Sequence, residues 1–265
     1  MPKTLIYSGS VTFYGAGPLI FTNSQACGSI IFVHKIVQHA AAKQNSGMEM
    51  NITIRYLFMA ALELASLHGV AQKKVISEAV ITYRIQVADA STANKAVAAV
   101  FDGATLRVTV KGFQARSEFI SPMRNQTILF DGKQKTGMLL RESGNEKYMM
   151  PMDANEWMRY NARFENINWV KLGNTKTIEG TQVENWKGTL KDGTEIIAWV
   201  ATDMDLLARG YDGQFTGLDG LPMEYEVTNS GVKVNYLVTS IAFQPVNSAR
   251  FDPPTAGYKV LKYNQ

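Results

Sequence analysis

Cysteine and histidine are scarce in this chain, and neither occurs after residue 68. The one cysteine is Cys27, and the three histidines are His34, His39 and His68. Catalysis by a Cys/His pair or a Ser/His/Asp triad needs an imidazole that accepts a proton, and zinc sites overwhelmingly use His or Cys. The long segment from residue 69 onward therefore excludes these sites, and it excludes an internal disulfide.

An excess of one charge is also missing. The chain has 27 Lys and Arg against 23 Asp and Glu, a formal net charge of +4. These charges are spread along the sequence, whereas nucleic-acid binding usually leaves a clustered basic footprint. Lys133 and Lys135 come closest to a patch, and a solvated hairpin turn explains them. We therefore expect no nucleic-acid partner.

The chain has no apolar run long enough for a membrane helix, but a shorter run resembles a secretory signal peptide. Tyr56 to Leu67 is about a dozen residues, whereas a span needs about 20. Arg55 supplies the basic region before it, and Gly69 and Ala71 supply small side chains at positions −3 and −1 of a cut. We expect cleavage near Ala71/Gln72 and a periplasmic or secreted protein.

An ordinary amphipathic helix is the other interpretation of this run. Ala61, Leu64 and Ala65 could share one face, and Glu63 is a charge that such apolar regions rarely contain. On the signal-peptide interpretation, residues 1–49 are a non-native upstream extension with poor structure, although a short strand and helix are the alternative there. Residues 50–71 are then the signal peptide, and residues 72–265 form a single β-rich exported domain without a transmembrane segment.

From residue 73 onward, apolar and polar residues alternate with a period of two. This pattern is typical of antiparallel strands with one buried face. Asp131-Gly132, Glu179-Gly180 and Asp192-Gly193 separate apolar runs and predict hairpin turns. The predicted strands are 79–87, 106–111, 127–130, 138–141, 147–150, 168–172, 175–178, 181–183, 186–190, 195–200, 223–228, 232–237 and 239–243.

One helix is predicted in this region. Asp153 is followed three residues later by Glu156, which is the pattern of a capping box, and the helix leads through Trp157 as far as Phe164. Strands joined in sequence order by short turns form a meander. We therefore predict a mainly β fold, a curved antiparallel sheet or half-barrel of about ten strands covered by one helix.

A resemblance rests on four separate segments. They are Thr175 to Gly180, Lys191 to Thr194, Gly217 to Tyr225 with its Gly220-Leu221-Pro222 motif, and Phe251 to Val260. Together they resemble uncharacterised bacterial exported families with a Gly-Leu-Pro motif, called GLPGLI-like. These families are similar to the LolA- and LolB-like periplasmic lipoprotein carriers and receptors. The resemblance implies a half-barrel with a greasy cavity that handles a lipid or lipoprotein.

Tryptophan and methionine are the residues that could line such a cavity. Met is adaptable and suits irregular apolar ligands, and pockets are rich in aromatic side chains. The candidate ligand-binding residues are Met149, Met150, Trp157, Met158, Trp169 and Trp199. The competing interpretation is that these side chains are the packing between helix and sheet.

The acidic residues give no comparable site. Asp203, Asp205, Asp212 and Asp219 fall in one Gly-rich stretch, but their order does not follow the twelve-residue calcium loop, and turn formation explains them. Paired carboxylates could hydrolyse a glycoside, yet no spacing singles out a pair. We predict no catalytic residue, no metal and no cofactor.

Two functions remain open. The first is a non-enzymatic exported envelope protein that binds a lipid, a lipoprotein or another apolar partner in its curved sheet. The second is a structural or interaction module of the envelope that uses a sheet edge and binds no small molecule. A hydrolase without His or Cys is the third and weakest option.

The export hypothesis makes a direct prediction about the N-terminus. When the full chain is expressed in a bacterium and recovered from the periplasm, N-terminal sequencing should begin at Gln72. A mature protein that begins before residue 50 would overturn the export hypothesis.

Overall fold

The computed structural model describes residues 10–11, 19–20, 73–89, 95–229 and 231–263. The chain divides into two units, Met1–Val70 and Ala71–Gln265. In the first unit, β1 (Ser10–Val11) pairs antiparallel with β2 (Leu19–Ile20). The predicted signal peptide and the rest of the predicted extension lie outside the described residues. Among the described helices, none is long and apolar enough to cross a membrane.

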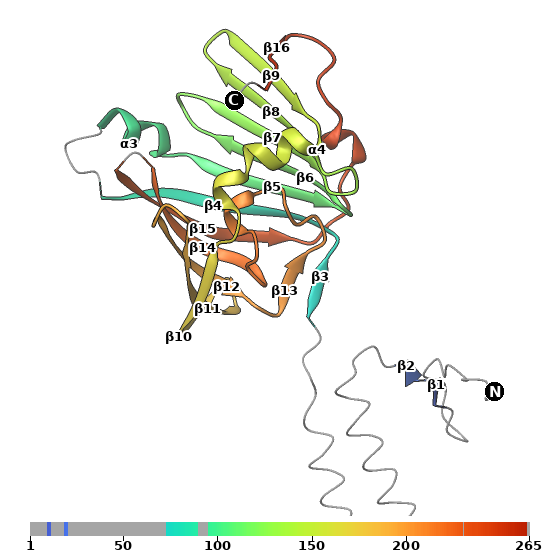
Figure 1. Ribbon diagram of the computed structural model, residues 1–265, viewed down its shortest axis with the longest axis vertical. Coiled ribbons are helices and arrows are strands. Elements are labelled where there is room, and N and C mark those ends of the chain that lie inside the picture. Colours follow the sequence, from blue (N-terminus) through green and yellow to red (C-terminus); the bar gives the residue numbers. More distant parts are fainter. Residues whose placement is uncertain (1–9, 12–18, 21–72, 90–94, 230, 264–265) are drawn as a thin grey trace, which may run out of the picture. The chain divides into compact units, whose positions relative to one another are not determined.

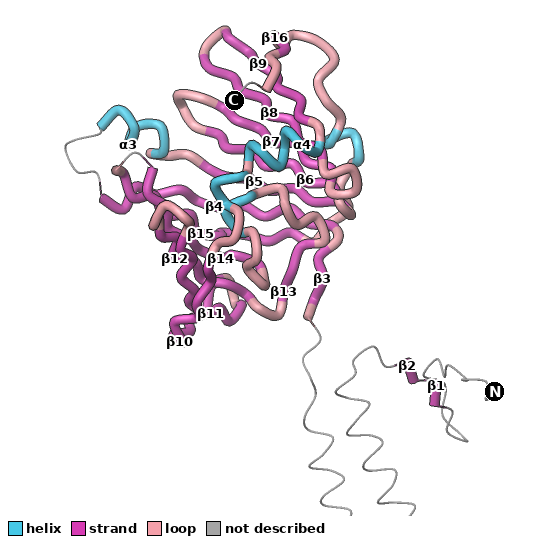
Figure 2. The backbone as a smooth tube through the Cα atoms, viewed as in Figure 1, coloured by secondary structure: helices cyan, strands magenta, loops and turns pink. Residues whose placement is uncertain are grey.

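The second unit is dominated by one twelve-stranded sheet, as Figures 1 and 2 show. Its spatial order is β10-β11-β12-β14-β15-β4-β5-β6-β7-β8-β9-β16. The strands are β4 (Glu78–Asp89), β5 (Thr105–Lys111), β6 (Gln114–Ile120), β7 (Asn125–Asp131), β8 (Thr136–Ser143), β9 (Glu146–Met152), β10 (Asn168–Ile178), β11 (Thr181–Thr189), β12 (Glu195–Ala201), β14 (Leu221–Asn229), β15 (Val232–Ala242) and β16 (Lys259–Val260).

Two antiparallel meanders and the short strand β16 make up this sheet. One meander runs from β4 to β9, the other consists of β10, β11, β12, β14 and β15, and β15 pairs with β4 to join them. The sheet is bent, and helix α4 (Ala154–Tyr160) lies across its concave face (Figure 1). The predicted fold class, a curved and mainly antiparallel sheet with minor helix, is confirmed. A separate parallel pair consists of β3 (Lys74–Ile76) and β13 (Met204–Leu206).

The predicted elements differ from the structure in detail. β6 and β16 were not predicted, because the β6 side chains that face the core include the small residues Ala115 and Ser117, and β16 has only two residues. The segments predicted separately within β10, β11 and β15 are single strands, since a register irregularity does not end them. A second helix, α3 (Lys95–Phe101), follows β4 and was also not predicted.

Helix α4 begins as predicted and ends earlier. The Glu156 backbone N–H donates to the Asp153 carboxylate at 2.8 Å, and the Asp153 N–H donates to the Glu156 carboxylate at 3.0 Å, which completes the capping box. The helix stops at Tyr160, and a 3₁₀ turn, η2 (Ala162–Phe164), follows it. The Asn161 backbone N–H and side-chain amide both donate to the Trp157 carbonyl, at 3.2 and 3.0 Å, and close the last turn of the helix.

Trp157 fixes α4 to the sheet. Its ring lies 5.4 Å from the Phe130 ring and 5.5 Å from the Tyr160 ring. On β8 it covers Gly137, where an added Cβ would lie only 2.0 Å from a ring carbon of Trp157. Because Gly137 has no side chain, the Trp157 indole can pack directly against the sheet at this position.

The C-terminal segment contacts the opposite face of the same strands. Arg116 donates to the Arg250 carbonyl at 3.1 Å, and Arg250 pairs with Glu118 at 3.3 Å. Arg116 and Glu118 alternate with the inward residues of β6, so this segment covers the convex face. It includes η4 (Ser248–Phe251) and ends in β16, which pairs parallel with β9.

We predict that Gly137→Ala lowers the free energy of unfolding by about 2–3 kcal/mol, because the new methyl group displaces Trp157. Urea denaturation measures the loss. Gly144→Ala is the matched control, since Gly144 has φ +57° and no atom within 4 Å of an added Cβ. The control should cost about 1 kcal/mol from backbone strain alone. Equal losses in the two variants would contradict this role of Gly137 in making room for the Trp157 ring.

Candidate functional site

A loop between β13 and β14 lies over the concave face; we call residues 207–220 the crossing loop. Tyr211 of this loop is buried, and Phe215 packs edge-on against Tyr225 of β14 with ring centroids 4.8 Å apart. The loop contains η3 (Gly213–Phe215), and the Trp169 indole N–H donates to the Thr216 carbonyl at 2.9 Å. Two cavities have Tyr211 and Asp212 of the crossing loop in their linings.

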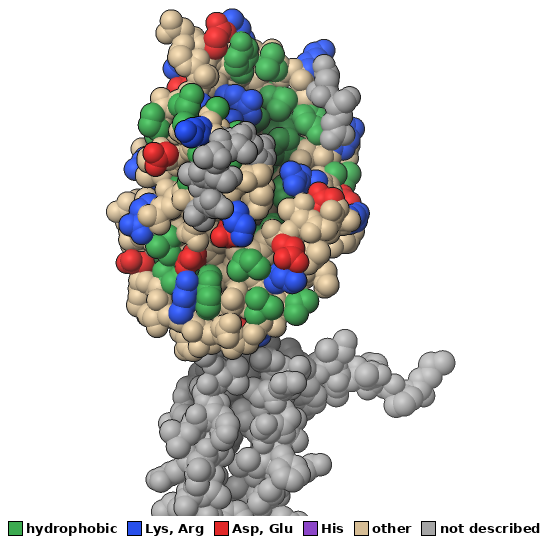
Figure 3. Space-filling view, turned by 90° about the vertical axis from the view of Figure 1, so that its left-hand side faces the viewer, with side chains coloured by type: hydrophobic (Ala, Val, Ile, Leu, Met, Phe, Trp, Pro, Cys, Tyr) green, Lys and Arg blue, Asp and Glu red, His purple; other side chains and the backbone are tan. Residues whose placement is uncertain are grey.

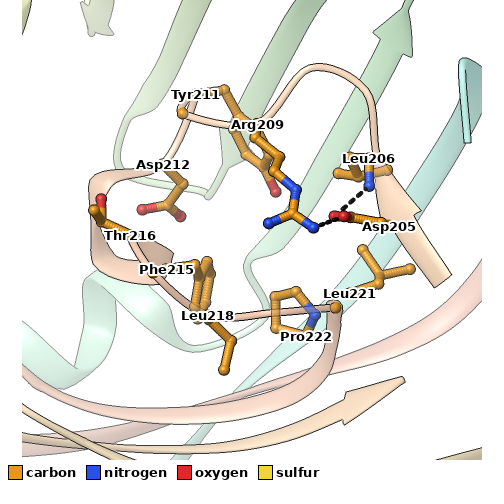
Figure 4. Close-up of a pocket in the computed structure, with 13 residues that line it drawn as sticks. Asp205, Leu206, Arg209, Tyr211, Asp212, Phe215, Thr216, Leu218, Leu221 and Pro222 are labelled. Atoms are coloured by element: carbon orange, nitrogen blue, oxygen red, sulfur yellow. Dashed lines mark hydrogen bonds and ion pairs between the residues drawn. The ribbon is translucent and has the colours of Figure 1, made fainter. Parts of the chain in front are cut away.

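The first cavity, shown in Figure 4, has a volume of about 290 Å³. Leu206, Phe215 and Leu218 supply its apolar lining. The full lining is Asp205, Leu206, Arg209, Gly210, Tyr211, Asp212, Phe215, Thr216, Gly217, Leu218, Gly220, Leu221 and Pro222.

The carboxylates beside this cavity form ion pairs with basic side chains. Lys73 pairs with Asp205 at 3.4 Å, and Arg209 pairs with Asp219 at 3.2 Å. Lys73 also contacts Asp219, and Arg209 also contacts Asp205. In the described part of the chain, no group of three or more His, Cys, Asp or Glu side chains is arranged to hold a metal ion.

The Gly220-Leu221-Pro222 motif forms part of the wall of the first cavity. At Gly220, φ is +132°, and an added Cβ would lie 2.6 Å from the Ala201 carbonyl oxygen. Glycine is therefore required by both the backbone conformation and the close approach to β12. Leu221 is fully buried, and the buried Tyr83 hydroxyl donates to the Pro222 carbonyl at 2.9 Å. These contacts give the motif a structural role at the start of β14.

The second cavity lies on the concave face between the two meanders and has a volume of about 250 Å³. Its apolar wall comes from α3, three strands of the first meander and two strands of the second. The Tyr225 and Tyr236 rings stack with centroids 4.5 Å apart at 8°. The lining is Phe101, Leu106, Ser117, Phe119, Arg124, Gln126, Ile128, Tyr211, Asp212, Gln214, Tyr225 and Tyr236.

Strand register places this lining on one face. Leu106, Phe119 and Gln126 are aligned across β5, β6 and β7. Ser117 and Ile128 form the neighbouring aligned pair, two residues along the same strands. Because side chains two apart point to the same face, all five project toward the concave side. Figure 3 shows hydrophobic side chains gathered next to Lys and Arg side chains in the upper part of one side of the molecule.

Asp212 is the one acidic residue of the second cavity. Burial raises its pKa to about 6, against the opposing effect of hydrogen bonds from the Gln214 backbone N–H at 3.2 Å and from its side-chain amide at 2.7 Å. Burial also raises the pKa of the Tyr225 and Tyr236 hydroxyls. These phenols therefore stay neutral at ordinary pH, and the two tyrosines contribute aromatic surface with neutral hydroxyls.

The structure places the predicted tryptophans in separate surroundings. Trp157 anchors α4 and Trp169 anchors the crossing loop, both on the concave side. Trp199 is aligned with Asn185 and Glu224 on the opposite face, where the Lys176 ammonium lies 4.2 Å from the centre of one of its rings.

The predicted methionines are equally dispersed. Met150 packs against the core of the concave side, and Met149 projects from the other face of β9. Met158 of α4 is 57% exposed. None of the six predicted ligand-binding side chains lines either of the two cavities, whereas Gly220, Leu221 and Pro222 line the first.

Sequence reasoning missed the residues that line the second cavity. Tyr225 and Tyr236 are recognisable only as inward positions of predicted strands, since their stacking depends on the register of β14 against β15. Phe119 lies on β6, which was not predicted. Arg124 lies in the turn after β6, where sequence alone gives no signal of burial.

No protein-family model matches the chain, and no curated protein matches it. Among solved structures, an uncharacterized conserved protein from Thermus thermophilus is 10% identical at a TM-score of 0.42, with 77% of this chain and 99% of that chain covered. PNGF-II is 12% identical at a TM-score of 0.39; 70% of this chain is covered, and the chain spans 30% of PNGF-II. The lipoprotein LppX of Mycobacterium tuberculosis is 11% identical at a TM-score of 0.26, with 69% and 92% covered.

We predict that Asp212→Asn stabilises the protein at neutral pH. The folded pKa of about 6 lies above the unfolded value of about 3.9, so the native state binds the proton more tightly and loses stability as pH rises from about 4 to 6. Asn cannot ionise, so the variant avoids this loss. The difference in free energy of unfolding between the variant and the parent should be about 2 kcal/mol larger at pH 8 than at pH 4. Denaturation curves at both pH values test this. A difference independent of pH would contradict it.

Proposed function

We propose that this protein is a non-enzymatic exported protein that binds a lipid or another apolar ligand in the second cavity. The observation that carries the proposal is the cavity itself, a hollow on the concave face of an open sheet in which aromatic and aliphatic side chains lie beside polar ones. Phe101, Leu106, Phe119, Ile128, Tyr225 and Tyr236 are six of its twelve lining residues. Sites for small ligands combine apolar and aromatic walls with placed polar groups that orient the ligand.

The chemistry of the lining supports binding over catalysis. Among the residues that line the second cavity there is no His, Cys or Lys, and Asp212 is the one carboxylate. General acid–base work on a glycoside needs two carboxyl groups, and nucleophilic catalysis needs a base beside the nucleophile. Ser117 has neither His nor Lys among its fellow lining residues. The polar groups are better suited to orienting a ligand than to attacking it.

The size of the cavity limits the ligand. About 250 Å³ is slightly below the range of about 300–1,000 Å³ typical of small-molecule sites. Tyr211, Asp212 and Gln214 of the crossing loop form part of the wall and bound the space that a ligand can fill. The ligand we propose is therefore a single slender apolar chain rather than a bulky ring system.

Export is the second part of the proposal. The pattern at residues 50–71 supports secretion, and the resemblance of the Gly217–Tyr225 segment to exported bacterial families supports an envelope location.

A second candidate function is pairing of the β10 edge with another protein. β10 is an outermost strand of the sheet, and Val170 and Leu172 are 47% and 44% exposed. However, the register is irregular between Lys171 and Thr175, and Gly173 has φ +83°. Bulges and lysines on an edge strand discourage pairing with another chain. The form of this edge therefore argues against the pairing function, and ligand binding is the better supported proposal.

The test is to recover the ligand. The full chain should be exported to a bacterial periplasm, purified without detergent, and measured by native mass spectrometry and lipid extraction. We predict a bound apolar molecule in the parent protein and its loss in Ser117→Phe, because the ring fills the second cavity. Asn125→Phe on the convex side is the matched control and should retain the ligand.

Circular dichroism and thermal unfolding should be measured to check that both variants are folded. Recovery of the same ligand from Ser117→Phe and the parent would place binding elsewhere. A ligand-free parent that forms a stable oligomer would instead support the edge-pairing function.

A further inference from the structure

Arg124 is held at the wall of the second cavity by its own turn. The Ser121 hydroxyl donates to the Arg124 carbonyl at 2.9 Å, and the Arg124 N–H contacts the Ser121 hydroxyl oxygen at 3.2 Å. The guanidinium carbon lies 5.6 Å from the centre of the Phe119 ring. The turn therefore holds the Arg124 backbone, and the aromatic contact places its guanidinium beside Phe119.

The Arg124 guanidinium lacks a carboxylate partner within the described residues. Its Nε atom is buried and has no hydrogen-bond partner there. Burying part of a charged group without a partner costs free energy, so such groups are normally paired. By contrast, Arg116 and Arg250 on the convex side both pair with Glu118.

A second arginine lies close to the first. Arg141 of β8 is aligned with Gln126 and Phe119 across β7 and β6, and its guanidinium donates to the Gln126 side-chain oxygen at 3.3 Å. Burial and then the charge of Arg141 lower the pKa of Arg124. Within the described residues, neither arginine forms an ion pair with an acid.

The acid closest in the lining does not remove this excess of positive charge. Asp212 accepts two hydrogen bonds from Gln214, and its carboxylate forms no ion pair with Arg124 among the described residues. Gln126 and Arg124 thus offer donors at one end of the cavity, while Leu106, Ile128 and Tyr236 offer apolar surface beside them.

We infer that Arg124 and Arg141 bind the anionic oxygen group of an amphiphile whose apolar chain lies in the second cavity. This inference rests on the proposed function and specifies its ligand as a chain with a carboxylate or phosphate head. The planar guanidinium fork suits both groups, because it donates two parallel hydrogen bonds to a pair of oxygens. The head lies at the Arg124 end, and the chain extends over Phe119 toward the stacked tyrosines.

The experiment compares ligands that share one chain and differ in the head. Decanoate, decyl phosphate and decanol are titrated into the protein by isothermal titration calorimetry at pH 8, below micelle-forming concentrations. We expect both anions to bind at least about tenfold more tightly than decanol, since hydrogen bonds to charged groups are the stronger ones. The tighter of the two anions identifies the carboxylate or phosphate source.

Matched variants assign the effect to the two arginines. Arg124→Gln and Arg141→Gln should each weaken decanoate binding about tenfold and leave decanol binding unchanged. Arg107→Gln is the control, because it removes the same charge from the opposite face of β5, where Arg107 is exposed. It should leave every affinity unchanged.

The outcomes separate this inference from the proposed function. The anion site is overturned if decanol and decanoate bind equally, or if Arg107→Gln loses as much decanoate affinity as Arg124→Gln. Either result is still compatible with a ligand in the second cavity. Failure of all three ligands to bind overturns both. An anion preference that disappears in Arg124→Gln, with thermal unfolding unchanged, supports the site.

Discussion

The pairing of β15 with β4 is the interaction on which the rest of the structure depends. It joins residues such as Tyr236 and Ile85, which are distant in sequence, and it makes one sheet from two meanders. Each meander alone could form from local hairpins, but the cavity wall needs Tyr225 and Tyr236 from one and Leu106 and Phe119 from the other. The register of this single seam therefore sets the shape of the second cavity.

Much of the local structure was predictable because short-range chemistry determines it. The alternation of apolar and polar residues predicted that Ile81 and Tyr83 share a buried face, and the Asp153/Glu156 pair predicted the start of α4. The missed elements are those where local signals are weak. Helix α3 has no acidic residue in its first turn and no basic residue in its last, so it has no charge signal at either end.

The candidate site was less predictable, because composition does not say which face a side chain occupies. Trp199 and Met150 are both apolar residues on strands, yet they project to opposite sides of the sheet. In β14, Met223 is one extra residue opposite Trp199 and Val200 of β12, so alternation alone does not give the alignment of these two strands. Gly137 and Gly188 are also decisive, and their role is visible only with Trp157 and Trp169 packed above them.

The parallel pairing of β16 with β9 has a consequence for biosynthesis. β9 emerges from the ribosome well before the residues that cover it, and the Lys259–Glu146 contact spans 113 positions. Until β16 arrives, the nascent chain presents an open strand edge, which is a template for wrong pairing. The joining of β15 to β4 is similarly late. A secretion route that keeps the chain unfolded until translocation is complete would spare the protein this exposed intermediate.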